Sequence, residues 1–347
     1  MTKSTLTRAS QQLFRRSPDE TFATLDDLWR HCQRQRDEST DMWERPESLR
    51  PMAEGDRLAL AVGSDSPLRL NGWSFSQLCS LAGISKDTVN RLTPETAALV
   101  FEETMPRAGK PLQVHTQNTL VRSVHAASYT RLHNIELLSI VREFATDFGP
   151  PQAAGAEGTQ GGTGLYCGEQ DMFCFLVDPA GWTEIDGEAF APGFFLWNSE
   201  VGKRSVGIQT FWFQAICRNH IVWDAVEVID FSRKHTARVG DAVGEIRRLI
   251  HRLVERRDER RDCFAQVIAK AMKTSLGSEE EDVAKLLARH GVTRSMAKEA
   301  LSIARQDGRF TIFSIVDALT RLSGQIANAG DRTDADAAAS GLLALAK

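Results

Sequence analysis

The sequence predicts an α+β protein: a mixed, mainly antiparallel sheet over about residues 110–230, flanked by N-terminal helices and followed by a helical C-terminal region. Three observations support this prediction. Helical spacing of apolar residues occurs in several early segments, short apolar runs separated by turn residues come next, and helical spacing persists from about residue 241. Strands and helices that occur in separate stretches are typical of the α+β class.

The early elements follow from local signals. Residues 75–81 and 94–104 have helical spacing, and Thr93 before Pro94-Glu95 is a suitable N-cap. Alternating apolar residues over 112–124 predict a hairpin or two short strands. Asn134 is then expected to cap a helix whose apolar face begins at Ile135.

The later elements are predicted to be strands first and helices afterwards. Residues 172–177 predict a strand, and Asp186-Gly187 predicts a type I′ turn between two more. Further strands are expected at 194–197 and 205–213. Helices are expected over 241–275, 279–290, 294–306, 312–327 and from 334 onward.

The length of 347 residues suits about two domains. We expect a helical N-terminal extension (1–60), an α+β core (61–240) and a helical C-terminal region (241–347). Residues 149–164 hold six glycines and two prolines, which indicates a linker or a long loop. We favour a loop within the core, because predicted strands on both sides could share a sheet.

Composition excludes several classes of protein. Hydrophobic residues make up 42% and charged residues 25%, so global disorder is not expected. No apolar run approaches the roughly 18 residues that span a membrane, and the N-terminus lacks the apolar stretch of a secretion signal. The six cysteines form no CxxC pair, which predicts reduced thiols and a cytoplasmic protein.

The net charge of −4 argues against a protein that coats DNA through bulk positive charge. The distribution is uneven, however. Residues 151–200 contain eight acidic and no basic side chains, whereas residues 203–261 contain thirteen basic and eight acidic ones. A local basic face therefore remains compatible with the sequence.

Two blocks, residues 193–202 (GFFLWNSEVG) and 217–223 (CRNHIVW), carry a family resemblance. Together with residues 121–134 and 317–321, they make the chain similar, over roughly residues 70–345, to the phage/plasmid-like family catalogued as domain of unknown function 932. The resemblance implies a mobile-element setting and little about chemistry. The residues that match the family motif are Asn198, Ser199, Glu200, Gly202, Cys217, Asn219 and His220.

The first candidate site is the turn around Gly202. Lys203 and Arg204, with exposed backbone amides, could form a corner that binds phosphate. The alternative is a structural turn in which Asn198 and Ser199 satisfy local backbone groups. Glu200 could also orient Arg204 or Arg218 through an ion pair.

The second candidate comprises Arg122, Tyr129 and Arg131, around the end of a predicted strand. Exposed guanidinium groups would hold a phosphate backbone and the tyrosine ring would stack on a base. The alternative, which we favour for this segment alone, is a tyrosine packed under a turn beside solvated arginines.

Metal and nuclease chemistry have weaker support. Cys217 and His220 have metal-like spacing without a second pair nearby, so a buried thiol beside a hydrogen-bonded histidine is expected, with no metal and no cofactor. The carboxylates at 171, 178, 184, 186, 188 and 200 could hold Mg²⁺ for a nuclease. Glu200 and Lys203 would nevertheless point to opposite faces of a strand.

Residues 75–92 fit the pattern of a helix-turn-helix. The second helix would begin at Ser85 and present Lys86, Asp87, Asn90 and Arg91 to duplex DNA. Because Thr93-Pro94 ends that helix after about two turns, we favour a corner of two packed helices.

These observations lead to one principal hypothesis: a non-enzymatic cytoplasmic protein of mobile-element metabolism that binds DNA, preferably single-stranded, during annealing or replication. The expected contacts are Arg122, Tyr129, Arg131, Lys203, Arg204 and Arg218. A duplex-reading regulator and a Mg²⁺-dependent nuclease are the alternatives. The sequence leaves a role in protein interaction and self-association open.

Overall fold

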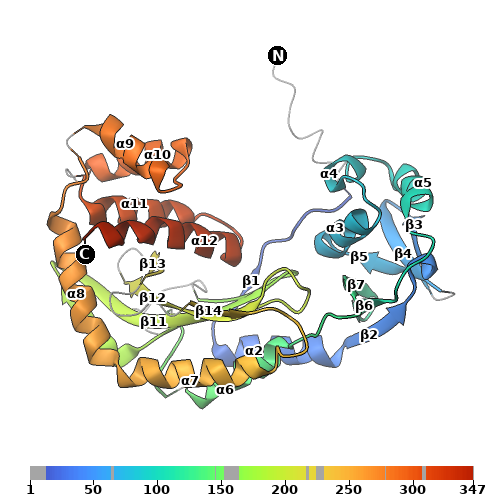
Figure 1. Ribbon diagram of the computed structural model, residues 1–347, viewed down its shortest axis with the longest axis horizontal. Helices are drawn as coiled ribbons and strands as arrows, with labels where there is room; N and C mark the ends of the chain where they lie inside the picture. The colour runs from blue at the N-terminus through green and yellow to red at the C-terminus, as the bar shows by residue number, and fades with distance from the viewer. Residues whose placement is uncertain are drawn as a thin grey trace.

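The strands form two separate sheets (Figure 1). The computed structural model describes residues 13–63, 66–144, 146–151, 164–215, 219–223, 230–277, 279–306 and 310–346. In sheet A the strand order is β1 (Glu20–Thr21), β8 (Leu165–Cys167), β9 (Met172–Val177), β11 (Glu188–Asn198), β12 (Val206–Gln214) and β13 (Asn219–Ile221). β10 (Thr183–Ile185) pairs with β11, β14 (Asp230–Arg233) pairs with β12, and all pairs are antiparallel.

Sheet B is smaller and curled. Its strand order is β2 (Ser39–Glu44), β6 (Leu112–Gln117), β7 (Leu120–Ala126), β5 (Leu68–Leu70), β4 (Arg57–Val62) and β3 (Leu49–Glu54), and only β5 and β7 are parallel. The chain between the edge strands β2 and β3 can span at most about 18 Å. In a flat sheet these strands would lie about 24 Å apart, so sheet B has to curl.

The helices are grouped around the two sheets. α3 (Gly72–Leu81), α4 (Lys86–Val89) and α5 (Pro94–Thr104) accompany sheet B, and α2 (Leu25–Asp37), α6 (Asn134–Glu143) and α7 (Asp241–Glu255) lie beneath sheet A. The C-terminal helices are α8 (Arg257–Lys273), α9 (Glu280–Arg289), α10 (Arg294–Gln306), α11 (Ile312–Ser323) and α12 (Ala329–Ser340). Short 3₁₀ turns are η1 (Pro46–Ser48), η3 (Pro179–Gly181) and η4 (Gly341–Ala346).

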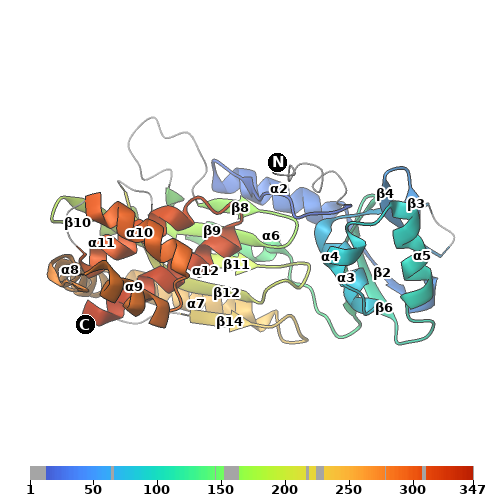
Figure 2. The same ribbon diagram turned by 90° about the horizontal axis from the view of Figure 1, so that it is seen from above.

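Sheet A is buried on both faces. Along β9, Cys174 belongs to the core shared with α2, α6 and α7, whereas its neighbours Phe173 and Phe175 belong to the core on the opposite face. Figure 2 shows α10, α11 and α12 over this opposite face. Because side chains alternate between faces, burial of both faces requires apolar residues at every position of the strand.

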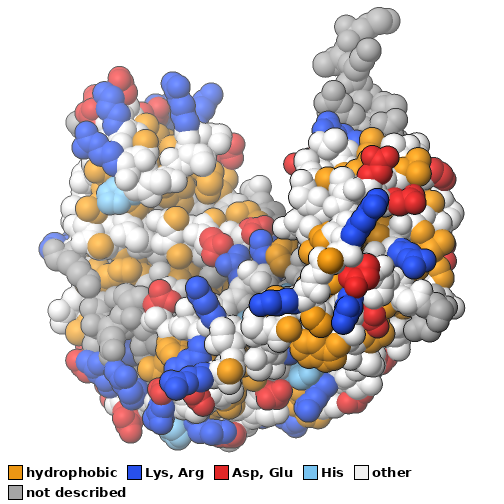
Figure 3. Space-filling view, turned by 45° about the vertical axis from the view of Figure 1, so that its right-hand side comes forward, with side chains coloured by type: hydrophobic (Ala, Val, Ile, Leu, Met, Phe, Trp, Pro, Cys, Tyr) orange, Lys and Arg blue, Asp and Glu red, His pale blue; other side chains and the backbone are white. Residues whose placement is uncertain are grey.

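The C-terminal helices dock on sheet A through an aromatic contact. The ring of Phe264 in α8 stacks on Trp212 of β12, with ring centroids 3.8 Å apart, and also meets the ring of Phe190. All three side chains are fully buried. The C-terminal helices stand over one end of sheet A and the sheet B lobe stands at the other end (Figure 1), with the hollow between them visible in Figure 3.

The α+β class is confirmed, and several local predictions agree with the structure. Asp186 and Gly187 both have positive φ, at 49° and 84°, as a type I′ turn requires. The hydroxyl of Thr93 accepts from the Thr96 amide and caps α5. The helix that begins after residue 133 is capped differently from the prediction, because His133 and Glu136 form the capping box and Asn134 is already helical.

The single predicted sheet over residues 110–230 is wrong. β6 and β7 belong to sheet B, so they do not share a sheet with the strands that follow residues 149–164. Residues 152–163 lie outside the described part of the chain. Residues 13–60 also contribute β2, β3 and the start of β4 to sheet B, where a helical extension was expected. The local periodicity of apolar residues predicts a strand, but it does not determine with which other strand that strand pairs.

No helix within the described ranges combines the length and the apolar character needed to cross a membrane.

The docking of α8 can be tested by stability. We expect Phe264→Ala to reduce the free energy of unfolding by about 3–5 kcal/mol, because it leaves a cavity against Trp212. Urea denaturation followed by circular dichroism measures this loss. Leu345→Ala is the control, since Leu345 is 42% exposed in the same C-terminal region and its truncation should have little effect. Equal losses in the two variants would contradict the proposed contribution of the stack.

Candidate functional site

The predicted motif residue Glu200 lies in the turn between β11 and β12 and is only 2% exposed. Its Oε2 accepts a hydrogen bond from Arg122 Nη1 at 2.9 Å, and its Oε1 accepts one from the Asn134 amide at 2.7 Å. The Nδ1 atom of His133 lies 3.6 Å from Oε1. Burial opposes the charge, but the interaction with His133 and the charge of Arg122 hold the pKa of Glu200 well below its usual range.

The other motif residues hold this turn against neighbouring segments. Asn198 Nδ2 donates to the carbonyl of Leu132 and to Asn134 Oδ1, and Ser199 Oγ donates to the carbonyl of Gln170. Both motif side chains are fully buried. They stabilise contacts with distant segments, rather than only local backbone groups.

Gly202 is required by both conformation and space. Its φ is +75°, which favours glycine, and a Cβ atom there would lie 2.6 Å from Cε1 of His125. The turn therefore packs directly on the end of β7 in sheet B.

Tyr129 is buried in an aromatic stack. Its ring lies between those of His125, 3.9 Å away by ring centroids, and His235, 5.3 Å away. Its hydroxyl donates to the carbonyl of Ser199 at 3.0 Å. Since both faces of the ring are occupied, the expectation of a base-stacking tyrosine is wrong for this conformation.

Arg122 and Arg131, the two arginines of the second candidate site, form ion pairs within the protein. Arg131 pairs with Asp41 at 2.9 Å and donates to the carbonyl of Glu200, and the guanidinium of Arg122 is held by the Glu200 carboxylate. Their side chains are only 4% and 5% exposed. The predicted exposed surface is therefore not formed by Arg122 and Arg131, because the carboxylates of Glu200 and Asp41 take up their charges.

The cations after the turn differ from each other. Arg204 lies 3.1 Å from buried Asp171 and 3.0 Å from Asp334 in α12, so it connects sheet A with the C-terminal helices. Lys203 is exposed, and its ammonium lies 5.4 Å from the centre of the Trp73 ring. Within the described residues, Lys203 forms no ion pair, unlike Arg204.

The last predicted segment is only partly described. Arg218 and Cys217 lie outside the described residues, and for Asn219 only the backbone in β13 is described. His220 is 1% exposed, and its ring stacks on Phe175 at 4.3 Å. Its Nδ1 atom lies 4.0 Å from a carboxylate oxygen of Asp336.

The two alternative functions, a duplex-reading regulator and a nuclease, can be compared with this geometry. Ser85 caps α4, which has only four residues, and Lys86 Nζ donates to the carbonyl of Gly72. The predicted DNA-reading helix is thus a single turn. Among the nuclease candidates, Asp178 is paired with Arg257. No group of three or more metal-ligating side chains occurs within the described ranges.

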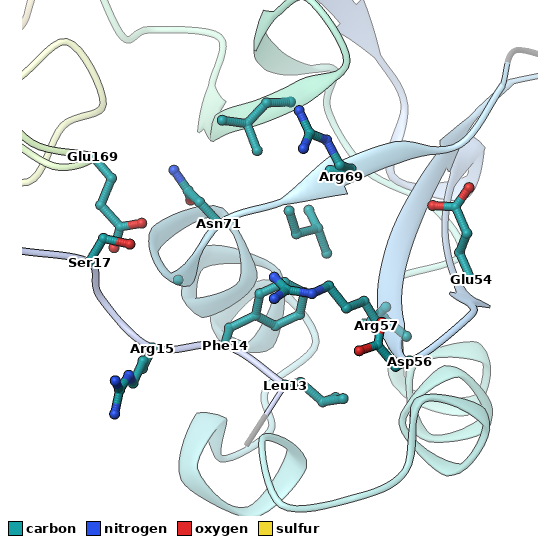
Figure 4. A pocket seen from close by; sticks show the side chains of 14 residues that line it. Leu13, Phe14, Arg15, Ser17, Glu54, Asp56, Arg57, Arg69, Asn71 and Glu169 are labelled. Atoms are coloured by element: carbon teal, nitrogen blue, oxygen red, sulfur yellow. The ribbon is translucent and has the colours of Figure 1, made fainter. Parts of the chain in front are cut away.

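A cavity that the sequence does not reveal lies between sheet B and the segment that precedes sheet A (Figure 4). Its volume is about 670 Å³. Arg15, Arg57 from β4 and Arg69 from β5 all line it and are all exposed. None of these three arginines forms an ion pair with the described part of the chain. Three arginines without ion pairs in the described residues therefore line one cavity.

Three acidic side chains, those of Glu54, Asp56 and Glu169, also line the cavity. Figure 4 shows Glu54 and Glu169 on opposite sides, with Arg57 extended between them and Asp56 beside Arg57. Glu169 accepts a hydrogen bond from the Gly72 amide, and burial raises its pKa. Arg57 is therefore the arginine that reaches between the acidic side chains, whereas Arg15 points away from them.

The backbone amides at the start of α3 do not add to this anion site. Asn71 Oδ1 accepts from the amides of Trp73 and Ser74, at 3.0 and 2.8 Å. The Gly72 amide is bonded to Glu169. An anion in the cavity would therefore be bound by arginine side chains. One sequence signal was available, because Arg69 alternates with the apolar Leu68 and Leu70 on a strand.

The Glu200 ion pair predicts a large loss of stability when one partner is removed. Glu200→Gln leaves the Arg122 charge buried without compensation, and we expect it to lower the free energy of unfolding by about 3–5 kcal/mol. Chemical denaturation measures the loss. Glu245→Gln is the control, because Glu245 pairs with Arg248 on the surface of α7. A loss no larger than that of the control would show that the pair does not hold the two sheets together.

The buried histidines predict a dependence of stability on pH. Burial, followed by the charge of Arg131, lowers the pKa of His125 from 6.5 to about 3. Between these values the unfolded chain binds a proton that the folded chain does not, so His125 costs stability as the pH falls. We expect the stability of the wild type relative to His125→Phe to fall between pH 7 and pH 5, by at most about 1.4 kcal/mol per pH unit. Denaturation at several pH values measures this; a constant difference would contradict the lowered pKa.

Comparison of the chain with models of protein families, with curated proteins and with solved structures finds no match. The similarity to the phage/plasmid-like family consequently stays a prediction from the motif residues.

Proposed function

We propose that the protein binds single-stranded DNA and that Arg15, Arg57 and Arg69 anchor its phosphate backbone in the cavity beside α3. The observation that carries this proposal is that three arginines, each without an ion-pair partner in the described residues, line one cavity of about 670 Å³. Guanidinium groups bind phosphate through charge-assisted hydrogen bonds.

The shape of the site favours a single strand over a duplex. A duplex reader usually places a long helix or a pair of strands in the major groove. Here α4 has four residues, and the arginines lie around a concave cavity. A flexible single strand can turn a phosphate into such a cavity, whereas a stiff duplex does so less readily. The family resemblance is the reason to connect this binding with mobile-element metabolism.

Fluorescence anisotropy with a labelled oligodeoxythymidine tests the proposal. We expect affinity to decrease with salt, with a log–log slope of about −2 if three phosphates are neutralised. Arg57→Gln or Arg69→Gln should each weaken binding about tenfold and make the slope less steep. A duplex and an RNA of the same sequence in parallel titrations establish the preference.

Arg248→Gln is the matched control. Arg248 is an arginine whose side chain is 69% exposed on α7 and is paired with Glu245, away from the cavity. Its substitution changes the net charge by the same amount and should leave affinity almost unchanged. Binding that is absent at low salt, independent of salt, or weakened equally by Arg248→Gln would overturn the proposal.

A further inference from the structure

Two thiols meet in the core beneath sheet A. Cys32 of α2 and Cys167 at the end of β8 are 0% and 2% exposed, and the two thiols interact with each other. Neither forms a disulfide. Both belong to the apolar core shared by α2, α6, α7 and sheet A.

The surroundings of Cys167 distinguish it from an ordinary core cysteine. His31 and Gln35, on the same face of α2 as Cys32, also contact it: His31 through a hydrogen bond, and Gln35 by accepting from Sγ at 3.8 Å. The hydrogen bond from Cys32, and next that from His31, lower the pKa of Cys167 against the effect of burial. The pKa of Cys32 is raised. These surroundings favour the thiolate on Cys167 over the thiolate on Cys32.

The cover over Cys167 is thin. The strand β1 pairs with β8 at the edge of sheet A and consists of only Glu20 and Thr21, both exposed. The side chain of His31 is itself 16% exposed. Since short edge elements open more easily than central strands, a small oxidant can approach Cys167 by local opening of β1.

We propose that Cys32 and Cys167 are an oxidisable pair that forms a disulfide on reaction with hydrogen peroxide. The Cys167 thiolate attacks one peroxide oxygen, so an S–O bond forms, the O–O bond breaks, and the leaving hydroxide takes the proton held by His31. The Cys32 sulfur then attacks Cys167, the S–O bond breaks, and hydroxide leaves with the Cys32 proton as water. Two thiols and one peroxide give one disulfide and two waters.

The position of the pair gives the disulfide a structural consequence. The charges of Arg122 and Glu200, which form the buried ion pair between the sheets, act on Cys32, and the charge of Arg122 also acts on Cys167. Moreover, α2 continues directly into β2, an edge strand of sheet B. A bond from α2 to β8 would therefore covalently fix sheet B relative to sheet A, whether or not the protein binds DNA.

The test uses the full-length reduced protein treated with hydrogen peroxide and analysed by peptide mass spectrometry. We expect a linked Cys32–Cys167 peptide, two hydrogens lighter than the sum of the separate peptides, and a higher Tm. Cys174 is an internal control: it is equally buried in the same core, and burial raises its pKa. It should stay reduced under conditions that oxidise the pair.

Two variants test the order of the steps. Cys32→Ser should stop the reaction at a sulfenic acid on Cys167, detected as a dimedone adduct. His31→Gln should slow oxidation several-fold at pH 7 and less at pH 9, where the thiol ionises without assistance. If a variant does not fold, the experiment on the wild-type protein alone decides the proposal. Absence of the linked peptide while circular dichroism stays native, or oxidation of Cys174 as fast as Cys167, would overturn the proposal.

Discussion

The buried carboxylate of Glu200 is the constraint on which the arrangement of the two sheets depends. A charge removed from water destabilises a protein unless it is paired and hydrogen-bonded. The partners of Glu200 come from β7 of sheet B, through Arg122, and from the start of α6, through the Asn134 amide. Because Glu200 itself lies at the end of a sheet A hairpin, compensation of its charge fixes sheet B and α6 relative to sheet A.

The same constraint determines which cations are available to a ligand. Arg122, Arg131 and Arg204 each compensate a carboxylate, and two of those carboxylates are almost fully buried. A polyanion could recruit such an arginine only by leaving that carboxylate unpaired, which is costly. Within the described residues, the arginines of the cavity beside α3 have no such partner. The residues that we propose for ligand binding are therefore different from those that hold the sheets together.

The features that the sequence predicts correctly depend on neighbours a few residues away. Asp186-Gly187 is a type I′ turn because both residues accept positive φ, and Thr93 caps α5 because its hydroxyl reaches an amide three residues on. Arg122 is different, since its partner lies 78 residues away and periodicity does not reveal whether an arginine on a strand faces water or a carboxylate. The cavity was missed for the same reason, because its arginines come from three separate segments.

Because the residues that hold the sheets together differ from those proposed to bind the ligand, only some substitutions are informative about binding. Removal of Arg122 would leave Glu200 buried and unpaired, so a loss of DNA binding could follow from a shifted sheet B as readily as from a lost phosphate contact. Arg57 and Arg69 are exposed and form no ion pair with the described residues, so their substitution removes charge and little packing. A motif match identifies residues that matter, but their burial and partners decide whether they bind a ligand or hold the fold.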